Sequence, residues 1–205
     1  MRHGMAQAGE AESLFKRAVA IKEKQGADSQ GLADPLLNLA AFYRKLGRPT
    51  AALPIYQRVI VLQEKHFGIE GQPLVATLEQ CACALRMDRK PLDASKMEQR
   101  AALIERKAEP DFVPVMGGAL PGQAIHKEQP PYPDAAKAAR LSGTVFIKVM
   151  IDETGRVIDA KILCGADLLA VASREAALKW RFKPSTINGQ PTKVKGILTF
   201  NFTLQ

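Results

Sequence analysis

An internal repeat of about 42 residues constrains the fold of the N-terminal half more than any other feature. AESLFKRAVAIKEK from Ala11, ALPIYQRVIVLQEK from Ala52 and ASKMEQRAALIERK from Ala94 share the leading Ala, an Arg six residues later and the final Lys. Two further segments, from Leu32 and from Leu74, recur between these copies with the same spacing. Such a repeat indicates structural units that stack on one another, because one unit alone cannot bury its apolar face.

The segments of the repeat have the apolar spacing of amphipathic helices. Leu36, Leu39 and Tyr43 fall on one helical face. Gly47-Arg48-Pro49 ends the first helix of its pair, since Gly adopts the left-handed cap and Pro cannot continue the helix. Pro91 stands at the equivalent place 42 residues later. The pattern predicts pairs of helices stacked as a solenoid.

The copies differ in ways that affect packing. The third copy has Glu98 where the others have Phe15 and Tyr56, which predicts weaker packing there. The first copy lacks a leading helix, because only ten residues precede it. Either the chain is a fragment, or apolar side chains of the first copy, such as Leu14 and Val19, are left partly uncovered.

A stretch rich in proline and glycine follows the repeats. EPDFVPVMGGALPGQAIHKEQPP, from Glu109, holds five of the thirteen prolines of the chain and a Gly-Gly pair. Pro and Gly interrupt both helical and strand periodicity. We therefore predict helical repeats at 1–108, a semi-extended linker at 109–128 and a second domain at 129–205.

In the second domain the apolar residues alternate with period two, as in half-buried strands. The first strand is TVFIKVMID, from Thr144, and the second covers about 156–163. Asp152-Glu153-Thr154-Gly155 predicts a hairpin between them, because Gly155 can adopt a positive φ. The last strand, VKGILTFNFTL, places five apolar residues on one face: Val194, Leu198, Phe200, Phe202 and Leu204.

Two helices complete the predicted αββαβ order. A short helix covers 134–141. A longer one begins after Asp167 as N-cap, carries Leu169 and Trp180 on one face, and ends at Pro184. We expect Trp180 to pack this helix onto the sheet.

Both halves resemble known families. The repeats are similar to the tetratricopeptide repeat, in the longer variety of kinesin light chains, through Leu39, Ala40, Tyr43, Gly47, Ala52 and Tyr56. The second domain resembles the TonB C-terminal domain through Tyr132-Pro133, Gly143, Val145, Asp152, Gly155, Val157, Trp180-Arg181-Phe182, Pro184 and Phe200. The resemblances imply a multi-domain chain, all-α followed by α+β.

The resemblance to the TonB family implies a function in protein binding. It implies an energy transducer of the periplasm whose last strand pairs with outer-membrane receptor segments in support of transport. No apolar run approaches the ~18 residues that cross a bilayer, so an inner-membrane anchor would lie outside this chain. The expected partner-binding residues are Tyr132, Pro133, Val194, Lys195, Ile197, Thr199, Asn201 and Thr203.

Alternatives stay open for both halves. The last strand could instead be protected by Lys193 and Lys195, or pair two copies of the chain as a homodimer. The repeats could present a concave surface to a partner protein, or serve as a spacer or dimerising segment. The second function considered is a soluble periplasmic scaffold whose repeats and TonB-like domain bind different proteins.

Other classes of function have little support. Asp152, Asp159 and His126 form no set of nucleophile, base and orienting group, and no phosphate-binding loop is present, so we expect no enzyme and no small-molecule substrate. The three Cys and three His lack the spacing of metal ligands, which argues against a metal or other cofactor. The formal net charge is +8, but its charges are spread along the chain, so we expect no nucleic-acid partner.

Overall fold

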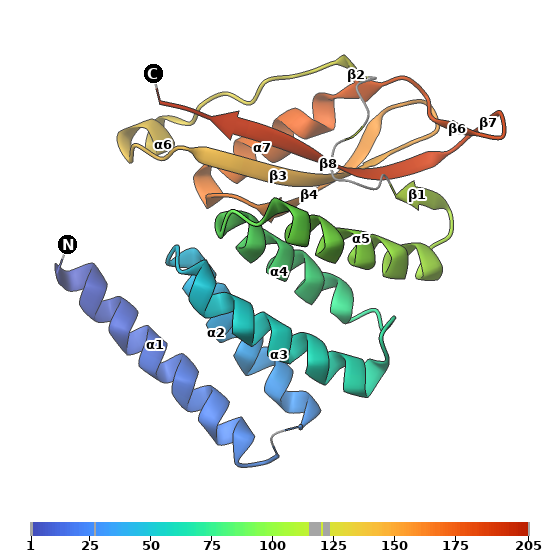
Figure 1. Cartoon of the computed structure of the whole chain (residues 1–205). Coiled ribbons are helices and arrows are strands. Elements are labelled where there is room, and N and C mark those ends of the chain that lie inside the picture. Colours follow the sequence, from blue (N-terminus) through green and yellow to red (C-terminus); the bar gives the residue numbers. More distant parts are fainter. Residues whose placement is uncertain (1, 27, 115–119, 121–123, 205) are drawn as a thin grey trace. The chain divides into compact units, whose positions relative to one another are not determined.

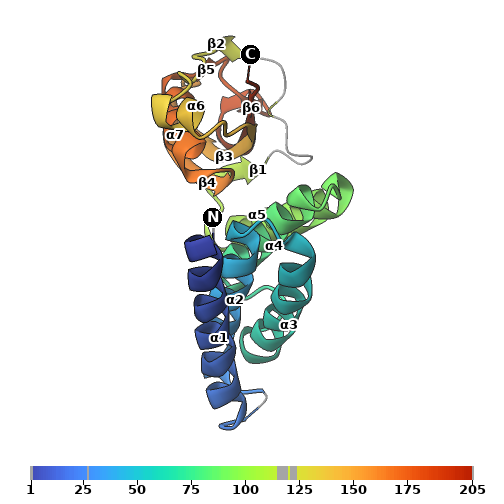
Figure 2. The ribbon, with the colours of Figure 1, turned by 90° about the vertical axis from the view of Figure 1, so that its left-hand side faces the viewer.

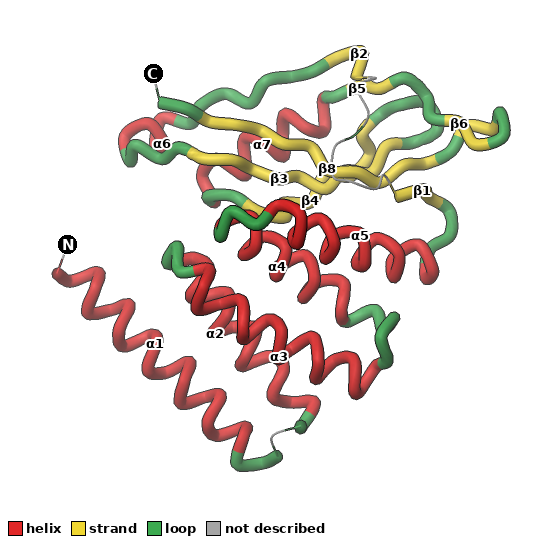
Figure 3. Tube along the Cα trace, in the orientation of Figure 1, coloured by secondary structure: helices red, strands yellow, loops and turns green. Residues whose placement is uncertain are grey.

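The computed structural model of the chain describes residues 2–26, 28–114, 120 and 124–204. These residues divide into two compact units, Met1–Ile104 and Glu105–Gln205. The first is built from helices and the second from a sheet with helices (Figure 3). The expected order of helical repeats followed by an α+β domain is confirmed. Residues 115–119 and 121–123 of the predicted linker lie outside the described residues.

The helical unit consists of antiparallel helices joined by short loops. Its elements are α1 Arg2–Glu23, η1 Gln30–Leu32, α2 Ala33–Lys45, α3 Pro49–Phe67, α4 Leu74–Met87 and α5 Pro91–Ala108, the last residues of which belong to the second unit. Helices α1, α2, α3 and α4 pack against one another in chain order (Figure 2). Pro49 and Pro91 each stand at the first position of a helix, where a missing N–H removes no helical hydrogen bond.

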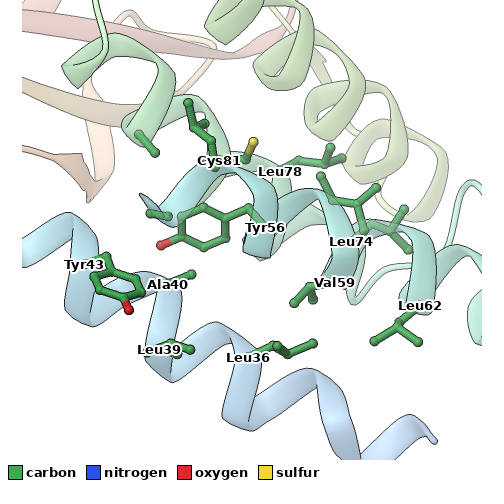
Figure 4. Packing of buried hydrophobic residues seen from close by; sticks show 14 of the residues in the cluster. Leu36, Leu39, Ala40, Tyr43, Tyr56, Val59, Leu62, Leu74, Leu78 and Cys81 are labelled. Carbon is green, nitrogen blue, oxygen red and sulfur yellow. The ribbon is translucent and has the colours of Figure 1, made fainter. Parts of the chain in front are cut away.

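The core of this unit follows the repeat. Tyr56 of α3 is fully buried between Ala40 of α2 and Leu78 of α4 (Figure 4). Its hydroxyl donates to Oε1 of Gln80 at 3.3 Å, so its one polar atom is paired. Because α3 contacts both flanking helices, this side chain ties two successive helix pairs together.

The atypical third copy replaces an aromatic contact by an ion pair. Glu98 accepts two hydrogen bonds from Arg86 of α4, from Nε at 2.9 Å and from Nη2 at 2.7 Å. In the first copy the equivalent Phe15 packs on Phe42, with ring centroids 5.2 Å apart. In the same helix as Phe15, Leu14 is 65% exposed. Glu98 is therefore held to the preceding helix by a charged pair of hydrogen bonds, and not by the packing of apolar side chains.

The second unit holds a four-stranded sheet. Its elements are β1 Phe112–Pro114, β2 Ala124–His126, α6 Asp134–Ala138, β3 Gly143–Ile151, β4 Val157–Cys164, α7 Asp167–Lys179, β5 Arg181–Phe182, β6 Thr186–Ile187, β7 Gln190–Pro191 and β8 Lys193–Phe202. The main sheet has the order β1-β8-β3-β4. Helix α7 covers one face of it (Figure 1), over a core that includes Ile147, Leu169 and Phe200.

The β3–β4 hairpin forms as predicted. The Oδ1 atom of Asp152 accepts hydrogen bonds from the N–H groups of Thr154 and Arg156, both at 2.9 Å, and from the Thr154 hydroxyl at 2.7 Å. Gly155 has φ +85°, and a Cβ there would lie 1.9 Å from the carbonyl oxygen of Phe182. This position therefore requires glycine for two reasons, its backbone conformation and the close approach of β5.

The predicted helices are longer than the observed ones. Helix α6 ends at Ala138 rather than at residue 141. The N-cap of α7 is Ala166 and not Asp167, which is the first helical residue. That helix ends at Lys179, before Pro184, because Trp180 already adopts an extended backbone that leads into β5. Leu204, predicted to share the core face of the last strand, follows β8 and is 44% exposed.

No helix among the described residues is long and apolar enough to cross a bilayer.

Candidate partner-binding edge

The last strand, β8, is paired from Val194 to its end on one side, and over a few residues on the other. On that side it runs antiparallel to β3, from Val194 opposite Ile151 to Phe202 opposite Gly143. On the other side β1 runs parallel to it and covers Lys193 to Lys195. In the part of the chain that the structure describes, no strand pairs with the outer side of 197–202. Among the described residues, the outer side of the strand predicted to lie at an edge is thus paired over its first three residues only.

Side chains along β8 alternate between the core and the opposite face. Val194, Leu198, Phe200 and Phe202 are buried, whereas Thr199 and Asn201 are exposed. The Asn201 Oδ1 atom accepts a hydrogen bond of 2.8 Å from the Thr144 hydroxyl of β3. The buried residues fix the register, because a shift by one residue would turn the phenylalanines to the solvent.

The predicted site residues at the start of β8 are already engaged within the chain. The side chain of Val194 is buried, so only its backbone could face a partner. The Lys195 ammonium lies 3.8 Å from the ring centroid of Phe112 and 3.3 Å from Oε2 of Glu109. Ile197, which lies beyond the part paired with β1, is half-buried.

Tyr132 points into the domain rather than away from it. Its hydroxyl donates to the carbonyl oxygen of Leu141, and its ring meets Phe202 edge-on with centroids 5.4 Å apart. Pro133 follows in an extended conformation as the N-cap of α6. These two predicted binding residues therefore hold the short helix against the end of β8.

The end of β8 borders an open hollow of about 770 Å³. It is lined by Tyr132, Lys137, Arg140, Thr203 and Leu204. The structure thus brings together Tyr132 and Thr203, two predicted site residues from distant parts of the sequence. The lining combines two cations with exposed apolar surface, a combination suited to an acidic or amphipathic peptide.

Sequence reasoning missed the covering of the strand by β1. Three residues with a proline carry no periodic pattern, so the sequence predicts a semi-extended linker over 109–128, whereas the structure has a strand at Phe112–Pro114. The signal available was the pair Phe112 and Val113, two apolar residues within a polar, proline-rich stretch.

Each of the two units contains a match to a known family. Residues 128–204 match the sequence model described as the Gram-negative bacterial TonB protein C-terminal. The second domain is a TonB C-terminal-like domain. Residues 33–73, which span α2 and α3, match a tetratricopeptide repeat model. Both resemblances inferred from the sequence are confirmed.

Several curated relatives of the TonB C-terminal-like domain are named Protein TonB. That of Xanthomonas campestris pv. campestris is 31% identical over 91 residues, which are 43% of this chain and 41% of the relative. That of Escherichia coli is 33% identical over 73 residues, 35% of this chain and 30% of the relative. That of Vibrio cholerae is 29% identical over 79 residues, 38% of this chain and 32% of the relative. The chain spans less than half the length of these relatives.

Solved structures are similar to each part of the chain. TPR-like repeats of a kinesin light chain from Podosopora anserina are 22% identical, with a TM-score of 0.46, over 51% of this chain and 50% of that one. The solution structure of the Pseudomonas aeruginosa TonB CTD is 26% identical, with a TM-score of 0.35, over 40% of this chain and 86% of that one.

Proposed function

We propose that this chain is a TonB-like energy-transducer protein, or a fragment of one, that binds outer-membrane receptor segments by strand addition. The binding supports transmembrane transport, and the chain acts by binding rather than by catalysis. Its compartment is the periplasm. The relatives named Protein TonB support the class of protein, and the geometry of β8 supports the mode of binding.

The observation that carries the proposal is the outer side of β8 from Ile197 to Phe202. Of the strands that the structure describes, only β3 pairs with the backbone along these residues. Every second N–H and C=O therefore points away from β3, where an extended segment of another chain can accept and donate. The exposed Thr199 and Asn201 stand on the face opposite the core, so a partner strand can be contacted without uncovering apolar residues.

The other edge of the sheet is less suitable for strand addition. The register of β4 against β3 shifts twice, near Ile147 and near Ile151. The carbonyl oxygen of Ala160 in β4 also accepts a hydrogen bond of 2.9 Å from Nε of Arg174 in α7. Irregular pairing and occupied backbone groups are common ways to protect an edge strand. The regular strand β8 is the better template.

The experiment uses the full chain with a photo-cross-linking amino acid at one position. At Asn201, on β8, we expect cross-links to outer-membrane receptors in an outer-membrane extract. The matched control carries the same group at Lys161, which is also exposed but lies on β4. Equal capture at both positions, or capture at Lys161 alone, would refute binding at β8.

Amide exchange with a receptor segment identified in this way tests the mode of binding. Exchange should slow at alternate residues between Ile197 and Phe202, because the intervening amides already face β3. Proline at a slowed position should abolish binding, since it removes the donor. Thr199→Ala and Asn201→Ala should weaken it only a fewfold, because the backbone supplies most contacts. Saturated binding without slowed amides in this stretch would exclude strand addition there.

A second function is favoured by the separate core of the helical unit. That core, centred on Tyr56, shares no residue with the core of the TonB C-terminal-like domain. A periplasmic scaffold would use the two units for different proteins and gain effective concentration from their linkage. A cross-linker at Asn38, exposed on α2, distinguishes the two functions. Capture of a protein other than the one found at Asn201 favours the scaffold.

A further inference from the structure

The chain itself occupies the beginning of the edge that the proposed function requires. Strand β1 pairs in parallel with β8, with Phe112 opposite Lys193, Val113 opposite Val194 and Pro114 opposite Lys195. This pairing uses the outer side of β8, the same side that is open farther along. A partner strand longer than the open stretch would meet β1.

Side-chain contacts hold β1 from both faces of the sheet. On one face the ring of Phe112, which is 2% exposed, lies under the Lys195 ammonium. The same ammonium pairs with Glu109, just before the strand. On the other face Val113 lines a mostly apolar cavity of about 200 Å³ together with Val194. The strand is thus anchored by a few specific contacts rather than by length.

Leu120 packs on the core face of β8, next to the part that β1 covers. Its side chain lies over Gly196 and packs against the core of the domain. A Cβ at position 196 would come within 2.5 Å of Leu120 Cδ2. The absence of a side chain at Gly196 therefore makes the room that Leu120 fills.

The covering strand β1 is short, so few backbone hydrogen bonds hold it against a competing strand. It contributes three residues, and Pro114 has no N–H to donate. A longer partner strand could supply more backbone hydrogen bonds than β1 does. The tether nevertheless gives β1 an effective concentration in the millimolar range, which a free partner must exceed.

We propose that β1 forms a built-in competitor that closes Lys193 to Lys195 against partner strands, with Leu120 packed beside it on the core face. This inference rests on the proposed function of the β8 edge. Partners either confine themselves to 197–202 or displace the competitor. Those that displace it bind only the fraction of molecules in which the edge is open, so their apparent affinity is the intrinsic affinity multiplied by that fraction.

The test uses the full chain and a synthetic peptide with the sequence of residues 108–114, AEPDFVP. Val113→Asp should release β1, because it places a carboxylate in the apolar cavity. Val113→Ile is the matched control, since it keeps an apolar β-branched side chain. Gly196→Ala places a methyl group where the Leu120 side chain packs on β8 and so displaces Leu120. The φ of residue 196 allows alanine. Peptide binding is followed by NMR titration, and amide exchange of Lys193 to Lys195 reports release.

We expect the peptide to bind Val113→Asp about tenfold or more tightly than the native chain and the Val113→Ile control. Gly196→Ala should change affinity in the same direction, and in both variants the amides of Lys193 to Lys195 that face β1 should exchange faster without peptide. Equal affinity for all four proteins would overturn the competitor but leave the proposed function intact. Absence of binding to every variant would also overturn the competitor, because an edge released from β1 should accept the same strand in trans. The proposed function concerns 197–202 and is tested separately by amide exchange along that stretch.

Discussion

Replacement of Trp180 by alanine tests how the TonB C-terminal-like domain holds its helix to its sheet. The indole is half-buried and meets Phe200 edge-on, with centroids 5.7 Å apart, and Phe182 at 6.0 Å. Its Nε1 donates a hydrogen bond of 2.8 Å to the carbonyl oxygen of Glu128. The side chain therefore joins the end of α7, the last strand and the segment before Tyr132.

The magnitude follows from these contacts. Aromatic side chains bury roughly 150–250 Å², and the lower figure applies to a half-buried indole. At about 25 cal/mol per Å² the loss of apolar burial is roughly 3–4 kcal/mol, and the lost hydrogen bond adds about 1 kcal/mol. We expect Trp180→Ala to lower the free energy of unfolding of this domain by about 3–5 kcal/mol, out of a typical 5–15 kcal/mol.

Urea denaturation of the full chain measures this loss. Trp180 is the single tryptophan, so its fluorescence reports the native domain, and circular dichroism or NMR reports the variants. The control Trp180→Phe keeps an aromatic ring but loses the bond to Glu128, and should cost only about 1–2 kcal/mol. A loss below about 1 kcal/mol for Trp180→Ala would show that the indole does not hold the domain together, and the reasoning from packing would fail.

Three further predictions concern other parts of the chain. Glu98→Ala should destabilise the helical unit by roughly 1.5–3 kcal/mol, because it removes charged hydrogen bonds of a partly buried ion pair. Arg86→Met with Glu98→Leu should be nearly neutral in urea denaturation, and an equal loss in both would contradict this. Hydrogen bonds from Thr154 and Arg156 hold the pKa of Asp152 below its ordinary 3.8. The resulting stabilisation is present above about pH 4 and lost as the pH falls, so Asp152→Asn should weaken the pH dependence of the urea midpoint; an unchanged dependence would refute it. A broad-specificity protease should cut first between residues 109 and 127, and first cuts elsewhere would argue against that linker.

The helical repeats could be recognised from the sequence because their signal is local and repeated. Leu36, Leu39 and Tyr43 recur at the helical period, and the same pattern returns 42 residues later. Each helix pair buries the face that this pattern defines, so the observed core follows directly from it. The hairpin at Asp152 to Gly155 was equally local, since one glycine conformation and one carboxylate determine the turn.

The position of Trp180 required the tertiary structure. Helical spacing from Leu169 placed it on a face of α7, but the helix ends one residue before it. Pairing of β5 with β2 and the bond to Glu128 draw the chain into an extended conformation there. Tertiary contacts thus override a helical pattern that is favourable in isolation.

Sequence alone established the order of the two domains, the strands of the second and the alternation that buries Phe200 and Phe202 along β8. Only the tertiary structure decided how much of that strand is open. Residues 112–114 lie about 80 positions before their partners at 193–195, and three residues are too few to show a period. Pairing between them depends on backbone groups that every residue carries, so no particular side chain signals it in the sequence. Residues 112–114 pair with β8 because the folded chain places them beside it, and no local pattern of residues predicts that placement.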